Sequence, residues 1–390
     1  MILWEPRLDA AASRWKAVAA QSAAEVFGPV AARHDQAQTY AHGNVDELVR
    51  TGLAAMFVPQ VYGGQGASLT ATVAAIEEVA AQCASTAAIM GVYQLGAFPL
   101  LLAGTEEHKH RYLAELAAGR ATSFALSERV AGSDAAALQT VAEEENGGWR
   151  LRGEKYWIGN GGISRYYVVF AKHLQDQRVS AFLVDGGQEG VEVSEVVDKM
   201  GLRATQTSNL RLDVWLPAAS LIGERGAGLT LASKTLNVGR LTVSAQATGL
   251  ARRAYFEASA RAVQRSAFGK PLIDHQGIGF KLADAATQLS AARLMLYEAA
   301  AAYDAGQPIE TLAAMTKLFA SEASHGIVDT AVQVWGGQGY CWPNPVERLY
   351  RDQRIIEIYE GSSEIQRMVL ARRIAKQTTQ HLSTSAGESL

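Results

Sequence analysis

The sequence predicts an α+β protein in which a helical domain, a β domain and a helix bundle follow one another along the chain. Alanine-rich blocks with helical periodicity fill the chain to about Gly119. Between Arg120 and Arg225 apolar and polar residues alternate instead, and helical blocks return after residue 226. A chain of 390 residues, 48% of them hydrophobic, can hold two or three cores. The expected domains are residues 1–119, 120–225 and 226–377, followed by a flexible tail over 378–390.

Glycine-rich and polar turns divide the first domain into helices, which we expect at Asp9–His34, Gly43–Leu53, Ser68–Cys83, Ser85–Leu102 and Thr105–Ala118. The uncharged run from Ala84 to Thr105 is long enough to span a bilayer. It contains Gln94 and Pro99, however, which favour two buried helical pieces around a kink. The sequence therefore predicts no membrane span.

The middle domain is predicted to be an antiparallel, barrel-like sheet. Over residues 210–216 leucine and valine take every second position, which is typical of a half-buried strand. Further short strands are expected at Tyr166–Ala171, Val179–Val184 and Gly190–Val197. Long helical blocks are absent between the strands, and this favours an antiparallel sheet over a βαβ arrangement.

The last domain is predicted to be a four-helix bundle, because its periodic blocks are long and separated by short breaks. They run over Leu229–Arg265, Ile278–Ala305, Ile309–Trp335, Pro345–Tyr359 and Ser363–Gln377.

Within this bundle, Glu360 lies at a predicted break between two helices. The first ends at Gly361, and Ser363 with Gln366 three residues later forms a capping box that begins the next. The free amides of a helix N-terminus can receive an anionic or carbonyl ligand. The position suits a catalytic base, and an acid in a surface loop would give the same pattern.

A second charged residue is expected near that break. Arg240 is the only charge in the run from Thr235 to Ala251, which predicts a largely buried helix. Leaving a buried charge unpaired costs about 3–5 kcal/mol. We therefore expect Arg240 to have an acidic partner, and Glu360 is a candidate.

Composition excludes several classes of function. A net charge of −3 and a pI near 6.3 give no basic surface for nucleic acid. Cys83 and Cys341 are far apart in sequence and have no ligand spacing, which indicates reduced thiols. The N-terminus lacks the apolar core of a signal peptide, so a cytoplasmic protein is expected. No metal site is predicted.

Six segments occur in order along the chain: FALSERVAGSD (124–134), GEKYWIGNGG (153–162), DKMGLRATQTSNL (198–210), RSAFGKPLIDHQ (265–276), QVWGGQGY (333–340) and IYEGSSEIQR (358–367). Together they resemble the acyl-CoA dehydrogenase family, with a short-chain-like pattern, over almost the entire length. The resemblance implies FAD, a homotetramer built as a dimer of dimers, and an electron-transfer flavoprotein as electron acceptor.

The resemblance also implies which residues hold FAD. Those near the flavin ring and phosphates are Phe124, Ala125, Leu126, Ser127, Ser133, Trp157, Ile158 and Gly159. Those that serve a cofactor shared across subunits are Arg265, Phe268, Gln276, Gln333, Gly336 and Gly337, and Ser362 and Glu364 are placed beside the cofactor as well. Arginine suits the pyrophosphate because its guanidinium is a permanently charged, bidentate donor.

For the reaction, the resemblance implies that Glu360 removes the α-proton of an acyl thioester while a β-hydride passes to FAD. Some relatives carry the base one residue before the arginine, but Gly239 occupies that position here. The implied substrate-binding residues are Ser133, Asn237, Arg240, Tyr359 and Gly361, with Met90, Tyr93 and Gln94 at the pocket floor. Bulky residues there predict a short- to medium-chain substrate.

The chain departs from the family pattern at three places. Arg129 and Val130 replace a proline and a glycine, Gly159 replaces a threonine near flavin N5, and Asn237 stands where relatives acting on CoA often have aspartate. These departures leave open whether CoA or an acyl-carrier protein presents the substrate. A flavin-dependent monooxygenase or oxidase of the same fold is the alternative enzyme, and a non-catalytic scaffold is the alternative outside enzymes.

Overall fold

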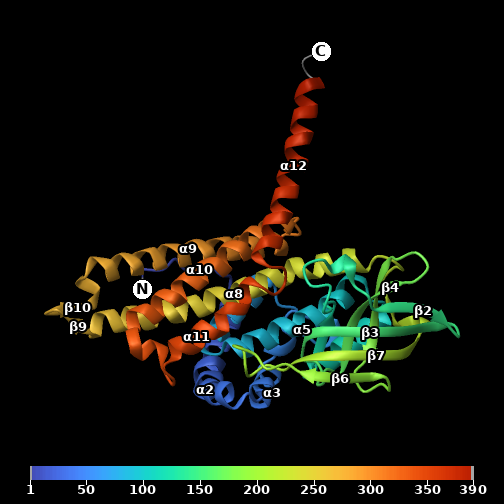
Figure 1. Ribbon diagram of the computed structural model, residues 1–390, viewed down its shortest axis with the longest axis horizontal. Helices are drawn as coiled ribbons and strands as arrows, with labels where there is room; N and C mark the ends of the chain where they lie inside the picture. Colours follow the sequence, from blue (N-terminus) through green and yellow to red (C-terminus); the bar gives the residue numbers. More distant parts are fainter. Residues whose placement is uncertain (1, 388–390) are drawn as a thin grey trace.

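The computed structural model describes residues 2–387 and forms a helical domain, a β domain and a second helical domain in chain order (Figure 1). The last helix of the first domain, α7, ends at Ala117, and the first strand, β1, begins at Thr122. The last strand of the sheet, β8, ends at Ile222, and α8 begins at Gly228. The fold class predicted from the periodicity is confirmed.

The helices of the first domain are α1 (Ala10–Ser22), α2 (Gly28–Ala37), α3 (His42–Arg50), α4 (Leu69–Gln82), α5 (Ala84–Ala103), α6 (Glu106–His108) and α7 (Ala114–Ala117). Side chains of Asp9, Ser68 and Thr105 cap α1, α4 and α6 by accepting from backbone amides. Wider π-helical turns at Ala23–Phe27 and Lys109–Leu113 interrupt two helices that the sequence predicts to be regular.

Helix α5 is continuous, so the predicted kink into two pieces is wrong. Pro99 lies inside the helix, five residues before the C-cap at Gly104. Among the described residues α5 is the one helix long and apolar enough to cross a membrane. Of its most apolar 18-residue window, 67% is buried inside the protein, where α5 packs against α4, α8 and β1. This packing is that of a core helix.

Within residues 2–387 the middle domain contains one eight-stranded sheet in the order β6-β7-β3-β2-β4-β5-β8, with β1 beside β4. The strands are β1 (Thr122–Ala125), β2 (Val141–Glu145), β3 (Gly148–Gly159), β4 (Tyr166–His173), β5 (Val179–Asp185), β6 (Val191–Val196), β7 (Thr207–Pro217) and β8 (Leu221–Ile222). β4 pairs in parallel with both β1 and β2, whereas the other pairings are antiparallel. The expectation of a purely antiparallel sheet is therefore wrong at β4.

The parallel pairings arise from chain connectivity. The loop between β1 and β2 spans residues 126–140, which is long enough for both strands to reach β4 in the same direction. Strands β1, β2 and β3 were not predicted from the sequence. In β2 and β3, charged residues obscure the alternation of apolar and polar positions.

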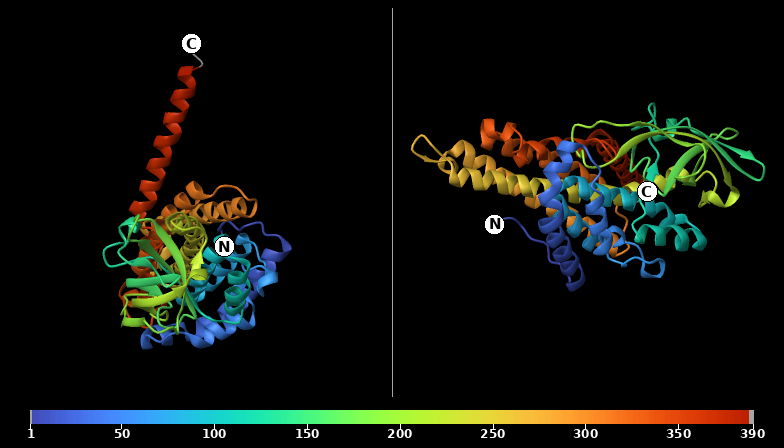
Figure 2. Two further views of the ribbon diagram at one scale, coloured as in Figure 1. Left: turned by 90° about the vertical axis from the view of Figure 1, so that its right-hand side faces the viewer. Right: turned by 90° about the horizontal axis from the view of Figure 1, so that it is seen from below.

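The C-terminal domain is built on three long helices, α8 (Gly228–Gln264), α9 (Gln276–Asp304) and α10 (Glu310–Trp335), followed by α11 (Pro345–Gln353) and α12 (Ser363–Gly387). A short hairpin of β9 (Ser266–Ala267) and β10 (Lys270–Pro271) joins α8 to α9 at the end of the molecule farthest from the sheet (Figure 1). α8 packs against α10, α9, α4 and α5, so it links the two helical domains (Figure 2).

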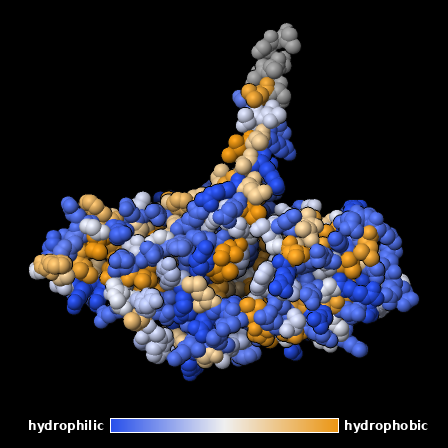
Figure 3. All heavy atoms as spheres, in the orientation of Figure 1, coloured by the Kyte–Doolittle hydropathy of each residue, from blue (hydrophilic) through white to orange (hydrophobic). Residues whose placement is uncertain are grey.

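Helix α12 leaves the body of the protein and projects away from it (Figures 1 and 2). The predicted helix end at residue 377 is wrong, because α12 continues to Gly387. Figure 3 shows apolar side chains among polar ones along this projecting helix. The exposed large apolar residues of α12 are Met368, Ile374 and Leu382.

Candidate active site

A cavity of about 560 Å³ opens where α5, α8, the β domain and the break before α12 meet. Ten residues that the sequence predicts to bind cofactor or substrate line it together: Phe124, Leu126, Ser127, Ser133, Trp157, Gly159, Arg240, Tyr359, Glu360 and Gly361. They come from β1, β3, α8, the loops beside the strands and the break before α12. All three domains therefore contribute to one site.

The wall on the β-domain side carries a large aromatic surface. The register of β3 against β7 shifts between Lys155 and Ile158, and Trp157 within this irregularity has φ +57°. The backbone N–H of Trp157 donates to the Asn209 side chain at 3.0 Å. The bulge leaves the indole 55% exposed at the cavity, a surface that suits a flat apolar ligand.

Gly159 is tightly matched to α5 across the cavity wall. A Cβ atom built on Gly159 would lie 2.8 Å from Cγ2 of Val92, a separation that real side chains do not adopt. The valine thus occupies space that a side chain at position 159 would need. Glycine in place of the family's threonine at position 159 therefore fits the packing of Val92 against this strand.

The neighbouring predicted residues Ala125 and Ile158 point the other way. Both side chains are buried in the core of the sheet and do not line the cavity, because successive residues of a strand face opposite sides. Any contact that they make with a cofactor is through their backbone.

A buried ion pair anchors the loop that follows β1. Lys155 Nζ donates to Glu128 Oε1 at 2.7 Å and to the Leu126 carbonyl at 3.1 Å. Glu128 also accepts from the backbone amides of Gln139 and Thr140. The loop carrying Ser127 and Ser133 is therefore held firmly at its base, although its proline and one glycine are replaced.

The break before α12 is left-handed at two consecutive residues. Glu360 has φ +53° and Gly361 has φ +92°. The predicted capping box is shifted by one residue, since the Ser362 hydroxyl accepts from the Ile365 amide and α12 begins at Ser363. Gln366 does not reach back to the cap, because its side-chain amide donates to the Gly361 carbonyl at 2.8 Å.

The carboxylate of Glu360 is buried at the cavity. Within the described part of the chain its Oε2 atom has no hydrogen-bond partner. Burial raises the pKa of Glu360 to about 8, against the positive charges of Lys317 and Arg240, which lower it. A buried carboxyl group with a pKa near neutrality is suited to accept a proton from a bound ligand.

Arg240 lies on the same cavity, but the predicted ion pair with Glu360 is not formed. In residues 2–387 no ion pair joins the two side chains, and Nη1 of Arg240 donates instead to Asn237 Oδ1 at 2.6 Å. Burial lowers the pKa of Arg240, and the charge of Glu360 opposes this change. Asn237 therefore acts through Arg240, and it does not itself line the cavity.

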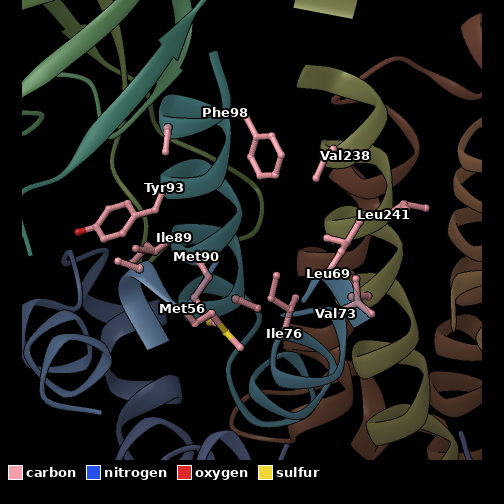
Figure 4. Close-up of a cluster of buried hydrophobic side chains, with 14 of the residues drawn as sticks. Met56, Leu69, Val73, Ile76, Ile89, Met90, Tyr93, Phe98, Val238 and Leu241 are labelled. Carbon is pink, nitrogen blue, oxygen red and sulfur yellow. The ribbon is translucent and has the colours of Figure 1, made fainter. Parts of the chain in front are cut away.

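The residues predicted at the pocket floor, Met90, Tyr93 and Gln94, lie elsewhere. All three are buried on the other side of α5, and Figure 4 shows Met90 and Tyr93 within the hydrophobic cluster that also contains Met56 and Ile89. The residues of α5 that line the cavity are Ala87, Ala88, Ile89, Gly91, Val92 and Leu95, of which Ile89 also belongs to that cluster. The prediction chose the wrong face because a uniformly apolar helix has no amphipathic pattern.

Three residues near the cavity were missed by sequence reasoning. Gln246 on α8 accepts from the Tyr359 hydroxyl and donates to the Ala84 carbonyl at 3.0 Å, which joins three elements beside the cavity. Lys317 on α10 and Val92 on α5 are the others. Gln246 and Lys317 share a signal with Arg240, since each is a polar side chain on a buried stretch of helix.

The remaining predicted cofactor residues lie far from this cavity. Gln264, the last residue of α8, is 24 positions beyond Arg240, or about 36 Å along a helix. Next to it, Arg265, Gln276 and Phe268 are exposed, the last by 97%. Arg261 donates to Gln338 at 2.8 Å, which brings the segment with Gln333, Gly336 and Gly337 to the same end of the bundle.

Ser362 and Glu364 occupy the first turn of α12 and its cap. The Glu364 side chain is exposed, and hydrogen bonding to Ser362 lowers its pKa. It is not among the residues that line the cavity.

The cavity residues fit the flavin that the sequence resemblance implies. An exposed indole, the apolar side chains of Phe124 and Leu126, and a glycine at position 159 leave a broad apolar surface open beside the strands. The Ser127 hydroxyl and the backbone of the same loop supply polar groups at its edge. The Glu360 carboxylate lines the same cavity from the break before α12.

Comparison with known proteins supports the same family. The acyl-CoA dehydrogenase N-terminal, middle and C-terminal domain models match residues 11–120, 123–214 and 226–375. The mitochondrial short-chain specific acyl-CoA dehydrogenase of Bos taurus is 43% identical over 358 residues, 90% of this chain and 87% of the relative.

Two solved structures extend the likeness to three dimensions. Butyryl-CoA dehydrogenase from Megasphaera elsdenii has a TM-score of 0.92 at 34% identity and covers 95% of this chain and 100% of its own. A glutaryl-CoA dehydrogenase from Mycobacterium smegmatis in complex with FADH2 has a TM-score of 0.89 at 26% identity, covering 94% and 95%. The chain belongs to the acyl-CoA dehydrogenase family.

Proposed function

We propose that this protein is a FAD-dependent dehydrogenase of short-chain acyl-CoA thioesters. One observation carries the proposal: a buried carboxylate, Glu360, whose Oε2 atom is unpaired among the described residues, lines a largely apolar cavity together with an exposed tryptophan. The 43% identity to a short-chain specific relative supports the substrate class. CoA is the proposed carrier on the same ground.

Glu360 acts as the base that removes the α-proton of the bound thioester. Burial holds the pKa of its carboxyl group near the operating pH, so the ionised form is both available and basic. The backbone amide of Glu360, in the left-handed break, is the expected donor to the thioester oxygen and stabilises the charge that develops there. Bound FAD supplies the acceptor for the hydride from the β-carbon.

Arg240 has a supporting role in this scheme. Its guanidinium is buried beside the cavity and its Nε atom has no partner within the described residues. The positive charge limits the rise in the pKa of Glu360. Asn237 orients the guanidinium through the 2.6 Å hydrogen bond.

The length of the acyl group is limited by Gln246. This residue lies six positions beyond Arg240 on α8, or about 9 Å along the helix, and is bonded to Tyr359 and to the start of α5. The three elements therefore close on one another where an extended acyl chain would pass. A butyryl group is the proposed substrate, and the short-chain preference rests on Gln246 and Tyr359 instead of Met90, Tyr93 and Gln94.

Two partners are proposed with this function. Phe268 and its neighbours at the far end of the bundle are exposed, which supports a homotetramer whose subunits complete one another's cofactor sites. An electron-transfer flavoprotein is the proposed acceptor of the electrons.

Anaerobic flavin bleaching tests the proposal. The purified yellow protein is mixed with butyryl-CoA, octanoyl-CoA, palmitoyl-CoA and the butyryl thioester of an acyl-carrier protein. Bleaching by butyryl-CoA with formation of the trans-2-enoyl product is expected. A protein that no acyl thioester bleaches, or one whose reduced flavin reacts rapidly with oxygen, would contradict it and favour the oxidase or monooxygenase alternative.

A further inference from the structure

Lys317 is a buried lysine that the reaction scheme above leaves unused. It lies on α10 with its side chain fully enclosed, and Nζ donates to the Gly361 carbonyl at 2.9 Å. Of the carboxylates that the structure describes, none forms an ion pair with it. Burying an ammonium group without a paired carboxylate is unfavourable in free energy, so we expect this buried lysine to have a function.

The Gly361 carbonyl that Lys317 contacts belongs to the break at the catalytic residue. The same oxygen accepts from Gln366 Nε2 at 2.8 Å, so two buried side chains fix one peptide group. Glu360, immediately before it, has a positive φ, which is unfavourable for a residue with a Cβ and persists only when its surroundings hold it. The two donors thus hold the backbone that aims the Glu360 carboxylate at the cavity.

The charges around the break also connect Lys317 to Glu360. Burial lowers the pKa of Lys317 to about 8, and the nearby carboxylates of Glu360, Glu357 and, more weakly, Glu322 oppose the change. For Glu360, Lys317 from α10 and Arg240 from α8 are the two cations that lower its pKa. The other charged or titratable neighbours are Tyr359, whose pKa is raised by burial, and two groups that contact Glu357, His325 at 3.0 Å and Arg354 at 2.6 Å.

Lys317 and Arg240 differ in their other bonds. Arg240 donates to a neutral amide on its own helix, whereas Lys317 donates to the carbonyl of the residue that follows the base. We propose that Lys317 is a positioning residue for the catalytic carboxylate: it fixes the Gly361 carbonyl and keeps part of the Glu360 population ionised at neutral pH. This inference rests on the proposed function, because it assigns Glu360 as the base.

The first test is the pH profile of flavin reduction by butyryl-CoA. In K317M and K317Q the acid limb should move to higher pH by about one unit, and the rate at pH 7 should fall on the order of 10-fold. K317R keeps a positive charge and should retain the wild-type limb. K234M removes an exposed lysine on α8 and should match the wild type throughout.

The second test does not need turnover. The thermal stability of E360Q is compared with that of the protein with Glu360 over a range of pH. The comparison is made once with Lys317 in place and once in proteins that also carry K317M. A pKa raised by folding makes this difference grow with pH until the carboxyl group ionises in the folded state. The pH at which the difference levels off should be higher in K317M and K317Q than with lysine.

These outcomes separate the two proposals. If acyl thioesters fail to bleach the wild-type flavin, the proposed function is wrong while the stability measurement still reports the coupling. If bleaching occurs but the acid limb and the levelling-off pH of K317M and K317Q coincide with those of the wild type, Lys317 does not position or charge the base. Loss of stability in these variants without a shift in either pH value would assign Lys317 a merely structural role.

Discussion

The Glu360 carboxylate lies against the Cα atom of Gly239, where a Cβ atom would be only 1.9 Å from Oε2. A side chain at position 239 and the observed carboxylate position therefore exclude each other. Helix α8 thus provides, at Gly239, the space into which the carboxylate of another segment fits.

This contact predicts the effect of G239A. The added methyl group must displace the carboxylate, so flavin reduction should slow on the order of 10-fold or more, within the worth of a positioned base. The protein should remain yellow. G326A is the matched control, because a Cβ on that helical glycine meets nothing within 4 Å and should leave the rate unchanged. Equal rates for G239A and the wild type would show that the base lies elsewhere.

The raised pKa of Glu360 predicts how rate and stability depend on pH. Only the ionised base accepts a proton, so kcat/KM should rise with pH through an apparent pKa near 8. Stability should respond in the opposite sense, because the unfolded chain ionises this group at lower pH than the folded one does. E360Q should be the more stable form, by a margin that grows on the order of 1 kcal/mol per pH unit between about pH 5 and 8. Thermal unfolding of both proteins across this range measures the margin, and a constant margin would show an unshifted pKa.

The hydrogen bonds of Gln246 predict a change in substrate length. Q246A removes the amide that joins Tyr359 to the start of α5 and opens space at that end of the cavity. Octanoyl-CoA should gain in kcat/KM relative to butyryl-CoA by on the order of 10-fold, the usual scale for space of a few methylenes. M90A on the buried side of α5 should instead lower stability without changing the ratio. The opposite pattern would show that Met90, and not Gln246, limits the length of the acyl chain.

The exposed end of the bundle predicts a dependence of cofactor binding on assembly. R265A should lose FAD during gel filtration, since an arginine suits a pyrophosphate and this one is exposed in the single chain. The fold of the subunit should be retained. R7A, also exposed but distant in sequence from any cofactor motif, is the control. A tight FAD-binding monomer, by native mass, would contradict the shared site.

Local signals in the sequence identified much of the site, but which residues line the cavity depends on the packing of helices and strands against one another. The break at Glu360 could be predicted because Gly361 and a cap residue mark it, although the cap is Ser362 instead of Ser363. The lining of α5 could not, because Met90 and Ala87 are both apolar and only tertiary contacts decide which faces the cavity. The predicted ion pair of Arg240 was wrong for a similar reason, since its guanidinium donates to Asn237, three residues away on the same helix.

The strands show the same limit. β7 alternates cleanly and was predicted, while β3 carries charged residues and a bulge and was not. The positive φ at Trp157 is a product of that bulge, so the exposure of the indole could not be read from its neighbours.

The role of Glu360 as the catalytic base is tested most directly by comparing E360Q with E364Q. Glutamine keeps the size of the side chain but cannot accept the α-proton, whereas Glu364 is exposed on the first turn of α12, outside the cavity lining. Both variants are purified with FAD, and bleaching by butyryl-CoA is followed anaerobically by stopped flow. We predict that E360Q binds the thioester and stays yellow, with a rate of flavin reduction lower by on the order of 10²–10⁴-fold, while E364Q reduces its flavin nearly as fast as the wild type. Flavin reduction by E360Q at the wild-type rate would contradict it.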